Sequence, residues 1–392
     1  MKVVQINAVI DKGSTGKIVA DISDMLTCNN VENYVFYADG LSDRKNAIKI
    51  SNNLDRKIHA FLSRLFGKQA CFSRLSTKRT LRQLDKIKPD VVHLHNLHHN
   101  YINLKMLLKY LAKNDIKTVL TLHDCWFFTG KCTHYVTAGC DKWQKECGNC
   151  PQLKKDNKSW FFDRTKFLLK QKQKYFSKIK NLKIVPVSYW MSEQVEKSFL
   201  GGRSINVISN GINTSIFNPN VKDLRQELGI KDEKVILGMA NKWMSPENEG
   251  LLDYVLDQLA DGYKFLLIGK RIEKENVVCV NYVNSPHELA RLYKTADIFV
   301  NVTHEDTLPT VNLESMATGT PVVTYKACGS TEIVTEKVGR IVEEYDKFGL
   351  VTAIKEVCEN SKDLFSAECV KRIVENYDKD KQFLKYLEVY NG

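Results

Sequence analysis

Two carboxylates and a glycine-containing turn stand at a fixed spacing in residues 296–334. Asp306 and Glu314 lie eight positions apart, and Gly319-Thr320-Pro321 follows them. A carboxylate accepts charge-assisted hydrogen bonds from hydroxyl groups. Two such groups beside one predicted helix start therefore indicate a polar site, if neighbouring elements hold them together.

The elements around these carboxylates predict an anion site at the start of a helix. An apolar strand over Ile298–Val302 runs into a polar turn, and Pro309 is expected in the first turn of an amphipathic helix, where its fixed φ is tolerated. The backbone N–H groups of Thr310 and Val311 would point out of that helix start. Together with the helix dipole they favour a phosphate.

The carboxylates fit a ligand that carries both sugar and phosphate. Glu314 lies one turn into the predicted helix, within reach of ribose hydroxyls while the phosphates rest on the helix end. Asp306 lies in the loop ahead of the helix, where it would meet a sugar ring. The alternative is an ordinary strand-loop-helix with a capping Asp or Thr.

This segment resembles the C-terminal signature of retaining glycosyltransferases of the GT-B type, family four. That signature places two Glu residues around a seven-residue spacer, followed by Ala-Met-Ala-x-Gly-x-Pro-Val-Val. Glu314 matches the second Glu, and residues 315–323 follow the rest closely. Asp306 replaces the first Glu and has Glu305 beside it, so either residue can carry the role.

Three further segments carry the same resemblance. Residues 3–22 read as strand, glycine-containing loop and helix, in which Gly13-Ser14-Thr15-Gly16 would let the backbone approach an anion; a plain turn is the alternative. Residues 207–219 resemble the family's entry into the second domain. His123, at the end of a strand, matches the family's His facing the donor sugar.

Length and periodicity predict two α/β domains. Two domains are the default for 392 residues. Short β-rich runs alternate with amphipathic helical runs, which predicts parallel sheets, two Rossmann-like halves of GT-B type and a site in the crevice between them. We expect an acceptor-binding domain over 1–202, a nucleotide-sugar domain over 203–376 and a last helix within 377–392 that packs back on the first domain. The expected strands are Lys2–Val9, Val91–Leu94, Thr118–Leu122, Ile184–Val187, Val235–Met239, Phe265–Ile268 and Ile298–Val302.

Positive charge is concentrated in the first half of the chain. Residues 1–200 carry a net charge of +18 and residues 201–392 carry −6. Segment 56–88 has ten basic residues against one acid, interleaved with apolar ones, which suits an anionic membrane surface. A solvated helical face is the alternative; nucleic acid is disfavoured because no motif accompanies the charge. With no secretory signal or long apolar run, we expect a cytoplasmic protein, at most peripheral to the inner leaflet.

Four cysteines cluster within the loop predicted over 125–150. Cys132, Cys140, Cys147 and Cys150 stand at a spacing compatible with a structural zinc ion, which would order a segment with little periodicity of its own. Cys125 and His134 are alternative ligands. Free buried thiols and a redox role for Cys147 and Cys150 are alternatives to zinc. A metal at His93, His95, His98 and His99 is disfavoured, because the family has His-Leu-His-Asn without a metal.

Cleavage of a bond to a nucleoside diphosphate leaves negative charge on the phosphate, which preorganised donors stabilise. In the family an Arg and a Lys on the first loop of the second domain help with this. Here Lys242 stands for the Arg, but Asn248 and Glu249 occupy the positions of the basic residues, so Lys242, Lys270 or Arg271 would have to compensate. No Asp-x-Asp motif ends a strand, so we expect no metal cofactor for catalysis.

The resemblance implies a glycosyltransferase that uses a UDP- or GDP-sugar and acts on a lipid-linked or saccharide acceptor, with retention, in capsule, O-antigen or exopolysaccharide synthesis. It implies His123 and Asp306 as catalytic residues. Donor binding would rest on the set Gly16, Lys242, Glu305, Thr310, Val311 and Glu314. A nucleotide-sugar epimerase and a non-catalytic partner of a transferase are the alternatives.

Overall fold

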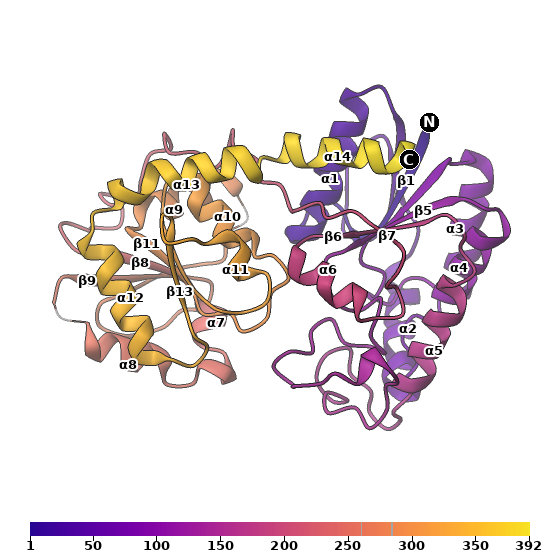
Figure 1. The fold of residues 1–392 in the computed structure, drawn as a ribbon, viewed down its shortest axis with the longest axis horizontal. Helices are drawn as coiled ribbons and strands as arrows, with labels where there is room; N and C mark the ends of the chain where they lie inside the picture. The colour runs from indigo at the N-terminus through magenta and orange to yellow at the C-terminus, as the bar shows by residue number, and fades with distance from the viewer. Residues whose placement is uncertain (260, 284) are drawn as a thin grey trace. The chain divides into compact units, whose positions relative to one another are not determined.

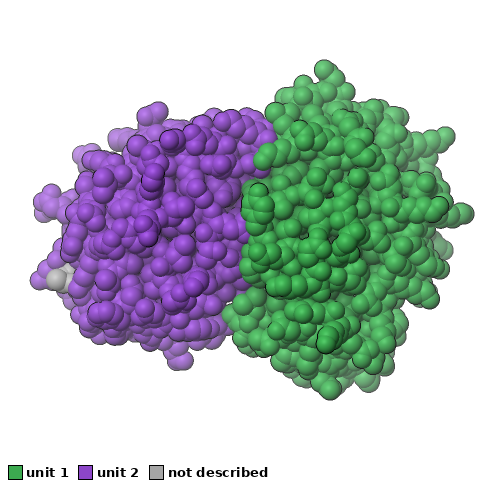
Figure 2. Space-filling view, in the orientation of Figure 1, with its two compact units in different colours: residues 1–209, 383–392 green, residues 210–382 purple. Residues whose placement is uncertain are grey.

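The computed structural model describes residues 1–259, 261–283 and 285–392. The chain forms two compact units, one of residues 1–209 with 383–392 and the other of residues 210–382 (Figure 2). Each unit is built on one parallel sheet with helices packed against it (Figure 1). The predicted α/β class with two Rossmann-like domains is confirmed.

The sheet of the first unit has seven parallel strands in the order β3-β2-β1-β4-β5-β6-β7. Strands β1, β4 and β5 are almost entirely buried because helices cover both faces, so their few polar residues, such as Gln5 and His93, are buried too. The bounds are β1 (Lys2–Val9), β2 (Glu32–Asp39), β3 (Ala47–Lys49), β4 (Val91–Leu94), β5 (Lys117–Leu122), β6 (Leu182–Pro186) and β7 (Ser204–Ile205).

Helices cover both faces of this sheet. On one face α1 (Gly13–Cys28) packs Ile22 and Leu26 beside Phe383 and Tyr386 of the last helix. The other face holds a larger core that includes Leu107, Leu108, Trp126 and Phe176. The remaining helices are α2 (Asn53–Phe66), α3 (Arg74–Ile87), α4 (Leu104–Lys113), η1 (Lys142–Gln144), α5 (Thr165–Phe176) and α6 (Tyr189–Glu196).

The second unit has a six-stranded parallel sheet in the order β10-β9-β8-β11-β12-β13. These strands are β8 (Lys234–Met239), β9 (Tyr263–Ile268), β10 (Val277–Val280), β11 (Ile298–Asn301), β12 (Val322–Tyr325) and β13 (Gly339–Val342). Its helices are α7 (Ala240–Trp243), η2 (Pro246–Asn248), α8 (Leu251–Gln258), α9 (Pro286–Thr295), α10 (Thr310–Ala317), α11 (Ser330–Ile333), α12 (Lys347–Glu359) and α13 (Lys362–Asn376). None of the helices in the described ranges is long and apolar enough to cross a membrane.

The boundary after residue 202 that we expected is wrong by seven residues. Ser204 and Ile205 form β7, which pairs with β6 at the edge of the first sheet, and the backbone N–H of Ile208 donates to the carbonyl of Pro186 at 3.1 Å. The first unit therefore continues to Ser209. The glycine pair that suggested a linker forms a turn instead, with Gly202 at a φ of +73°.

The last helix, α14 (Lys379–Asn391), begins in the second unit and ends in the first. Tyr390 and Tyr386 reach the interior of the first sheet, where the Tyr390 hydroxyl is 2.7 Å from Nδ1 of His93. Nε2 of His93 lies 2.7 Å from the hydroxyl of Thr121, which is 2.9 Å from the Tyr386 hydroxyl. This buried network, together with the packing of Phe383, attaches the end of the chain to the first unit.

Two residues of the motif in residues 207–219, Asn210 and Gly211, have structural roles at the start of the second unit. Asn210 is buried and donates from Nδ2 to the carbonyl of Leu308 at 3.2 Å, next to the start of α10. At Gly211 a Cβ atom would lie 2.4 Å from Cα of Lys379. Ile212 and Asp378 form a parallel β-bridge beside this contact. Only glycine fits here because the two chain segments that border the unit run in direct contact.

Candidate functional site

The predicted helix start is present at the carboxyl edge of the second sheet. Strand β11 leads into a loop, and α10 begins at Thr310, so Pro309 is the residue before the helix and not part of its first turn. Gly319, just past the helix end, has a φ of +79°, and a Cβ there would meet the Ser366 hydroxyl at 2.2 Å. The helix is thereby held between β11 and α13.

The amino end of α10 offers backbone donors. Among the described residues, the N–H groups of Thr310 and Val311 have no hydrogen-bond partner, whereas Asn312 donates to the carbonyl of Pro309 at 3.2 Å. Both residues are half-buried. Two such groups at a helix start are suited to an anion, and their phosphate-binding role stays a prediction.

Glu314 is oriented by a tyrosine that the sequence reasoning missed. The hydroxyl of Tyr293, on α9, donates to Oε2 of Glu314 at 3.2 Å. Tyr293 is fully buried, and burial raises its pKa well above the ordinary value, so the hydroxyl keeps its proton. Glu314 is half-buried. A fixed carboxylate one turn from the helix start matches the geometry expected for a ribose-binding residue.

Asp306 shapes the loop in which it lies. Its Oδ1 accepts from the N–H of Leu308 at 3.1 Å, and its carbonyl accepts from the N–H of Gly329 at 3.1 Å. Asp306 and Glu305 are both half-buried, beside the thiol of Cys328, whose pKa is raised to about 12 mainly by burial. Both acids therefore stay at the predicted place, and the assignment of the catalytic role between them stays a prediction.

Asn248 has a structural role where the family has a basic residue. It is buried, and its amide donates to the carbonyls of Lys242 at 3.0 Å and Val302 at 2.8 Å. Because both amide protons are used, Oδ1 is the acceptor for Nε2 of His304 at 2.9 Å. The side chain thus joins the loops that follow β8 and β11.

His304 joins two residues of this network. Its Nε2 faces Oδ1 of Asn248, and its Nδ1 lies 2.8 Å from Oε1 of Glu344. The ring also stacks on Tyr345 with centroids 4.3 Å apart.

The other candidate cations of the second unit differ in position. Lys242 is half-buried on α7, directly after β8, and β8 and β11 are neighbours in the sheet. Their carboxyl ends meet at one sheet edge, so Lys242 and the start of α10 share that edge. Lys270 and Arg271 are exposed, and Arg271 pairs with Glu273 at 3.3 Å. Lys242 is therefore the best-placed cation for a phosphate.

In the first unit, Gly16 is a packing position. The four residues Gly13 to Gly16 form the first turn of α1 and not the predicted loop, because the N–H of Asp11 donates to the carbonyl of Gly16 at 3.1 Å and closes the turn. A Cβ at Gly16 would lie 3.1 Å from a methyl of Val9. The close approach is thus to the chain's own loop, and contact with a donor stays a prediction.

His123 ends β5 and belongs to a chain of neutral hydrogen bonds. Gln5 donates its amide to the carbonyl of Val19 at 3.2 Å, so its Oε1 accepts from Nε2 of His95 at 3.1 Å. His95 is neutral because burial holds its pKa well below the ordinary range, so its Nδ1 accepts from Nε2 of His123 at 3.0 Å. Burial lowers the pKa of His123 itself to about 4.

The loop after His123 is held by buried charges. Burial alone would raise the pKa of Asp124, but His98 at 2.8 Å and the N–H of Trp126 bring it to about 2. Nζ of Lys172 lies 3.7 Å from the centre of the Trp126 ring and donates to the carbonyl of Thr129 at 2.9 Å. Burial lowers the pKa of Lys172 to about 7.

Comparison with known proteins decides the family. The model described as Glycosyltransferase Family 4 matches residues 16–216, and the model described as Glycosyl transferases group 1 matches residues 258–378. The chain belongs to this family of nucleotide-sugar-dependent glycosyltransferases.

Individual relatives agree with this membership. The chain is 22% identical to the putative colanic acid biosynthesis glycosyl transferase WcaC of Escherichia coli, over 100% of both chains. Among solved structures, sucrose-phosphate synthase from Thermosynechococcus elongatus matches at a TM-score of 0.72 and 14% identity, over 100% of this chain and 98% of that one. Anabaena Alr3699/HepE in complex with UDP and glucose matches at 0.66 and 15%, over 100% and 99%. This glycosyltransferase thus has the GT-B fold and resembles a polysaccharide biosynthesis enzyme.

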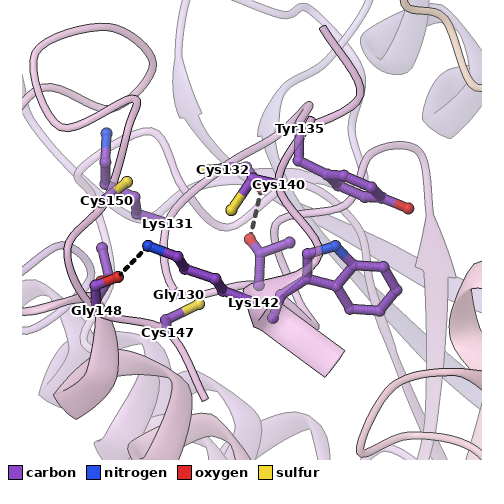
Figure 3. Close-up of a pocket in the computed structure, with 12 residues that line it drawn as sticks. Gly130, Lys131, Cys132, Tyr135, Cys140, Lys142, Cys147, Gly148 and Cys150 are labelled. Carbon is purple, nitrogen blue, oxygen red and sulfur yellow. Dashed lines mark hydrogen bonds between the residues drawn. The ribbon is translucent and has the colours of Figure 1, made fainter. Parts of the chain in front are cut away.

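The cysteine cluster of this glycosyltransferase lines one small pocket (Figure 3). Cys132, Cys140, Cys147 and Cys150 surround a cavity of about 20 Å³, with Trp143 and Tyr135 on another side. The thiol of Cys132 donates to Cys150, which lowers the pKa of Cys150 to about 7 and raises that of Cys132. Within the described ranges no three His, Cys, Asp or Glu side chains are arranged to hold a metal ion. The zinc expectation stays a prediction.

Proposed function

We propose that this glycosyltransferase moves a sugar, with retention, from a UDP- or GDP-sugar to a lipid-linked or saccharide acceptor in surface-polysaccharide assembly. The carrying observation is the fixed carboxylate of Glu314 one turn from the amino end of α10. Family membership and the resemblance to WcaC, described as a colanic acid biosynthesis enzyme, support the class of product. The UDP complexes of Alr3699/HepE support a UDP-sugar in particular.

The proposed site residues have different roles, according to the charge of the ligand group that each one contacts. Breaking the bond between the anomeric carbon and the phosphate leaves negative charge on the departing diphosphate. The amides of Thr310 and Val311, with Lys242, stabilise that charge because they are fixed before the reaction. Glu314 accepts from the ribose hydroxyls. Asp306 or Glu305, with His123 and Gly16 of the first unit, serve the donor sugar.

A nucleotide panel tests the donor. A ligand that binds only the folded state raises the melting temperature, so we expect UDP or GDP and the matching nucleotide sugars to raise it, while ATP and CTP do not. Calorimetry then gives the affinity. Absence of any nucleotide binding would support a non-catalytic partner instead.

A product assay tests the reaction. We expect sugar transfer only when a lipid-linked or saccharide acceptor is added, and retention of the anomeric configuration in the product by NMR. Isomerisation of the nucleotide sugar without acceptor would identify an epimerase. An inverted product would refute retention but leave the transferase assignment intact.

We further propose a structural zinc ion in the cysteine pocket. Its cavity of about 20 Å³ has room for one ion or water, and four cysteines, the preferred ligands of structural zinc, line it. We expect metal analysis of the purified protein to find about one zinc per chain, and Cys132→Ser to lose it. Cys28→Ser, at an exposed thiol elsewhere, is the control. The zinc site would be contradicted if the purified protein contains no metal and neither chelators nor added zinc change its melting temperature.

A further inference from the structure

Helix α2 exposes its apolar face to solvent and buries polar side chains. Its fully buried residues are polar, His59 and Ser63. Its apolar stripe, spaced as on one helix face, is instead exposed: Leu54 at 69%, Ile58 at 49% and Phe61 at 52%. A helix in a globular unit normally turns such a stripe toward the core. The apolar stripe of α2 is therefore exposed to solvent, where an amphipathic helix would normally pack it against other residues.

A loop far along the chain extends this stripe. The N–H of Trp160 donates to the carbonyl of Arg64 near the end of α2 at 2.7 Å, and the Trp160 ring meets Phe61 edge-on with centroids 5.7 Å apart. The next two side chains, Phe161 and Phe162, are also exposed. Three consecutive aromatic residues thus stand on the surface beside the apolar face of α2.

The position of this loop is fixed by close packing. Gly67 ends α2 at a φ of +63°, and a Cβ there would lie 2.2 Å from the carbonyl oxygen of Phe162. The same oxygen accepts from the Ser159 hydroxyl at 2.7 Å. The exposed rings are therefore held on a rigid backbone and not on a loose tail.

Exposed cations lie on the elements that carry the rings and on α3, which contacts α2 through a hydrogen bond from the Ser76 hydroxyl to Oδ2 of Asp55 at 2.9 Å. The guanidinium of Arg164 lies 5.5 Å from the centre of the Phe162 ring. Asp85, the one acid of segment 56–88, is engaged because its Oδ1 accepts from the Tyr110 hydroxyl at 2.7 Å. The exposed cations of α2, α3 and the aromatic loop are Lys57, Arg64, Arg74, Lys78, Arg79, Arg82, Lys86, Lys158 and Arg164.

We propose that this aromatic-basic face, defined as Leu54, Ile58, Phe61 and Trp160 to Phe162 with the cations above, docks on an anionic membrane surface. Amphipathic helices with aromatic apolar faces and flanking Lys and Arg insert at the headgroup boundary of such membranes. Each cation near the surface adds attraction to acidic lipids. A second copy of the chain fits poorly, because two such faces would oppose like charges.

The inference deepens the proposed function, on which it rests for the use of the surface, since a lipid-linked acceptor lies in the membrane. The proposed membrane-binding face differs in location from segment 56–88, for which the sequence predicted membrane binding. The face is built from two distant segments, and the loop of residues 159–162 supplies three of its four aromatic side chains.

Tryptophan fluorescence tests the contact directly. Of the five tryptophans, Trp126, Trp143 and Trp243 are fully buried and Trp190 is half-buried, whereas Trp160 is exposed on the proposed face. We expect phosphatidylcholine vesicles that contain phosphatidylglycerol to shift the emission to the blue and brominated lipids to quench it. Trp160→Phe should remove both responses. An unchanged spectrum with vesicles at saturating lipid would overturn the proposal.

Flotation with the same vesicles measures affinity, without nucleotide or acceptor, so its outcome is separate from that of the donor tests. We expect Phe61→Ser with Phe161→Ser to lower the affinity about tenfold or more, and Lys57→Glu with Arg64→Glu to do the same at low salt only. Phe348→Ser and Lys337→Glu, exposed on the second unit, should change neither. Equal binding by the double variants, or equal binding to neutral vesicles, would overturn the proposal. Binding to acidic proteins but not to vesicles would also overturn it.

Discussion

Each unit of the molecule has a histidine just after a sheet strand, and the two are held in opposite ways. His123, after β5, shares hydrogen bonds with neutral groups, and burial lowers its pKa to about 4. His304, after β11, faces an amide oxygen on one side and the carboxylate of Glu344 on the other. The same residue type thus bonds to neutral groups in the first unit and faces a carboxylate in the second.

The ends of β5 and β11 therefore hold their histidines by different means. Hydrogen bonds of Asn248 and His304 hold the loops of the second unit next to a helix start suited to an anion. In the first unit burial lowers the pKa of His93, His95 and His123, which keeps them uncharged, whereas Asp124, the residue after His123, keeps its charge. We expect donor affinity to depend on the second unit, which has this helix start, and turnover to depend on the first.

The largest effect is expected at Glu314. Replacing it with Ala removes the charge-assisted hydrogen bonds to the ribose, so nucleotide affinity should fall roughly 100-fold while the fold is kept. Calorimetry measures the affinity and circular dichroism the fold. Glu359→Ala, at an exposed acid at the end of α12 in the same unit, is the control. Full activity of the Glu314 variant would contradict the assignment of donor binding to the second unit.

His123→Asn should separate the two units further. We expect turnover to fall by about 10 to 100-fold, because a positioned hydrogen-bonding group at the donor sugar is lost, with nucleotide affinity unchanged. Steady-state kinetics, together with calorimetry of the nucleoside diphosphate, gives both quantities. A variant that loses nucleotide affinity and keeps kcat would reverse the division between the units.

Asn248→Ala tests the hydrogen-bond network of Asn248 and His304 in the second unit. It leaves the carbonyl of Val302 and Nε2 of His304 without partners, which should lower the free energy of unfolding by about 1–3 kcal/mol. Urea unfolding measures the change. A loss below about 0.5 kcal/mol, as for an ordinary surface substitution, would show that the network is dispensable.

The smallest effect concerns pH. His93, His95 and His123 have pKa values lowered by burial, so between pH 6.5 and about 4 the unfolded chain binds protons that the folded chain does not. Stability should therefore fall as pH drops through this window. Urea unfolding at pH 7 and about 5.5 measures the slope. His287→Gln, at an exposed histidine, should leave it unchanged, and a stability that rises on acidification would contradict the neutral histidines.

Much of the fold follows from the sequence, but its edges do not. Buried strands such as β4 and β11 are mainly apolar, with three apolar residues of four, so they are recognisable by themselves. Strands β7 and β10 are short and lie at sheet edges, where pairing with a neighbour decides the structure more than any local pattern. For the same reason the unit boundary was misplaced at a glycine pair.

The site shows a similar limit. Residue type and spacing suffice for Glu314, Thr310 and Val311, because they belong to one strand-loop-helix segment. The groups that orient the site residues come from elsewhere: Gln5 reaches His95 across 90 positions, and Tyr293 lies on a different helix from Glu314. Such contacts leave no local signal, and only the folded chain reveals them.

The direct contact of Gly211 with Lys379 bears on how the protein was assembled. Residues 210 and 382 bound one continuous unit whose two ends are adjacent, while Ile208 and Phe383 share a core of the other. The second unit is thus an insertion that could be excised or exchanged as a cassette, with a short loop to rejoin what remains. If the second unit binds the donor as proposed, donor specificity could then be transplanted between relatives without rebuilding the first unit.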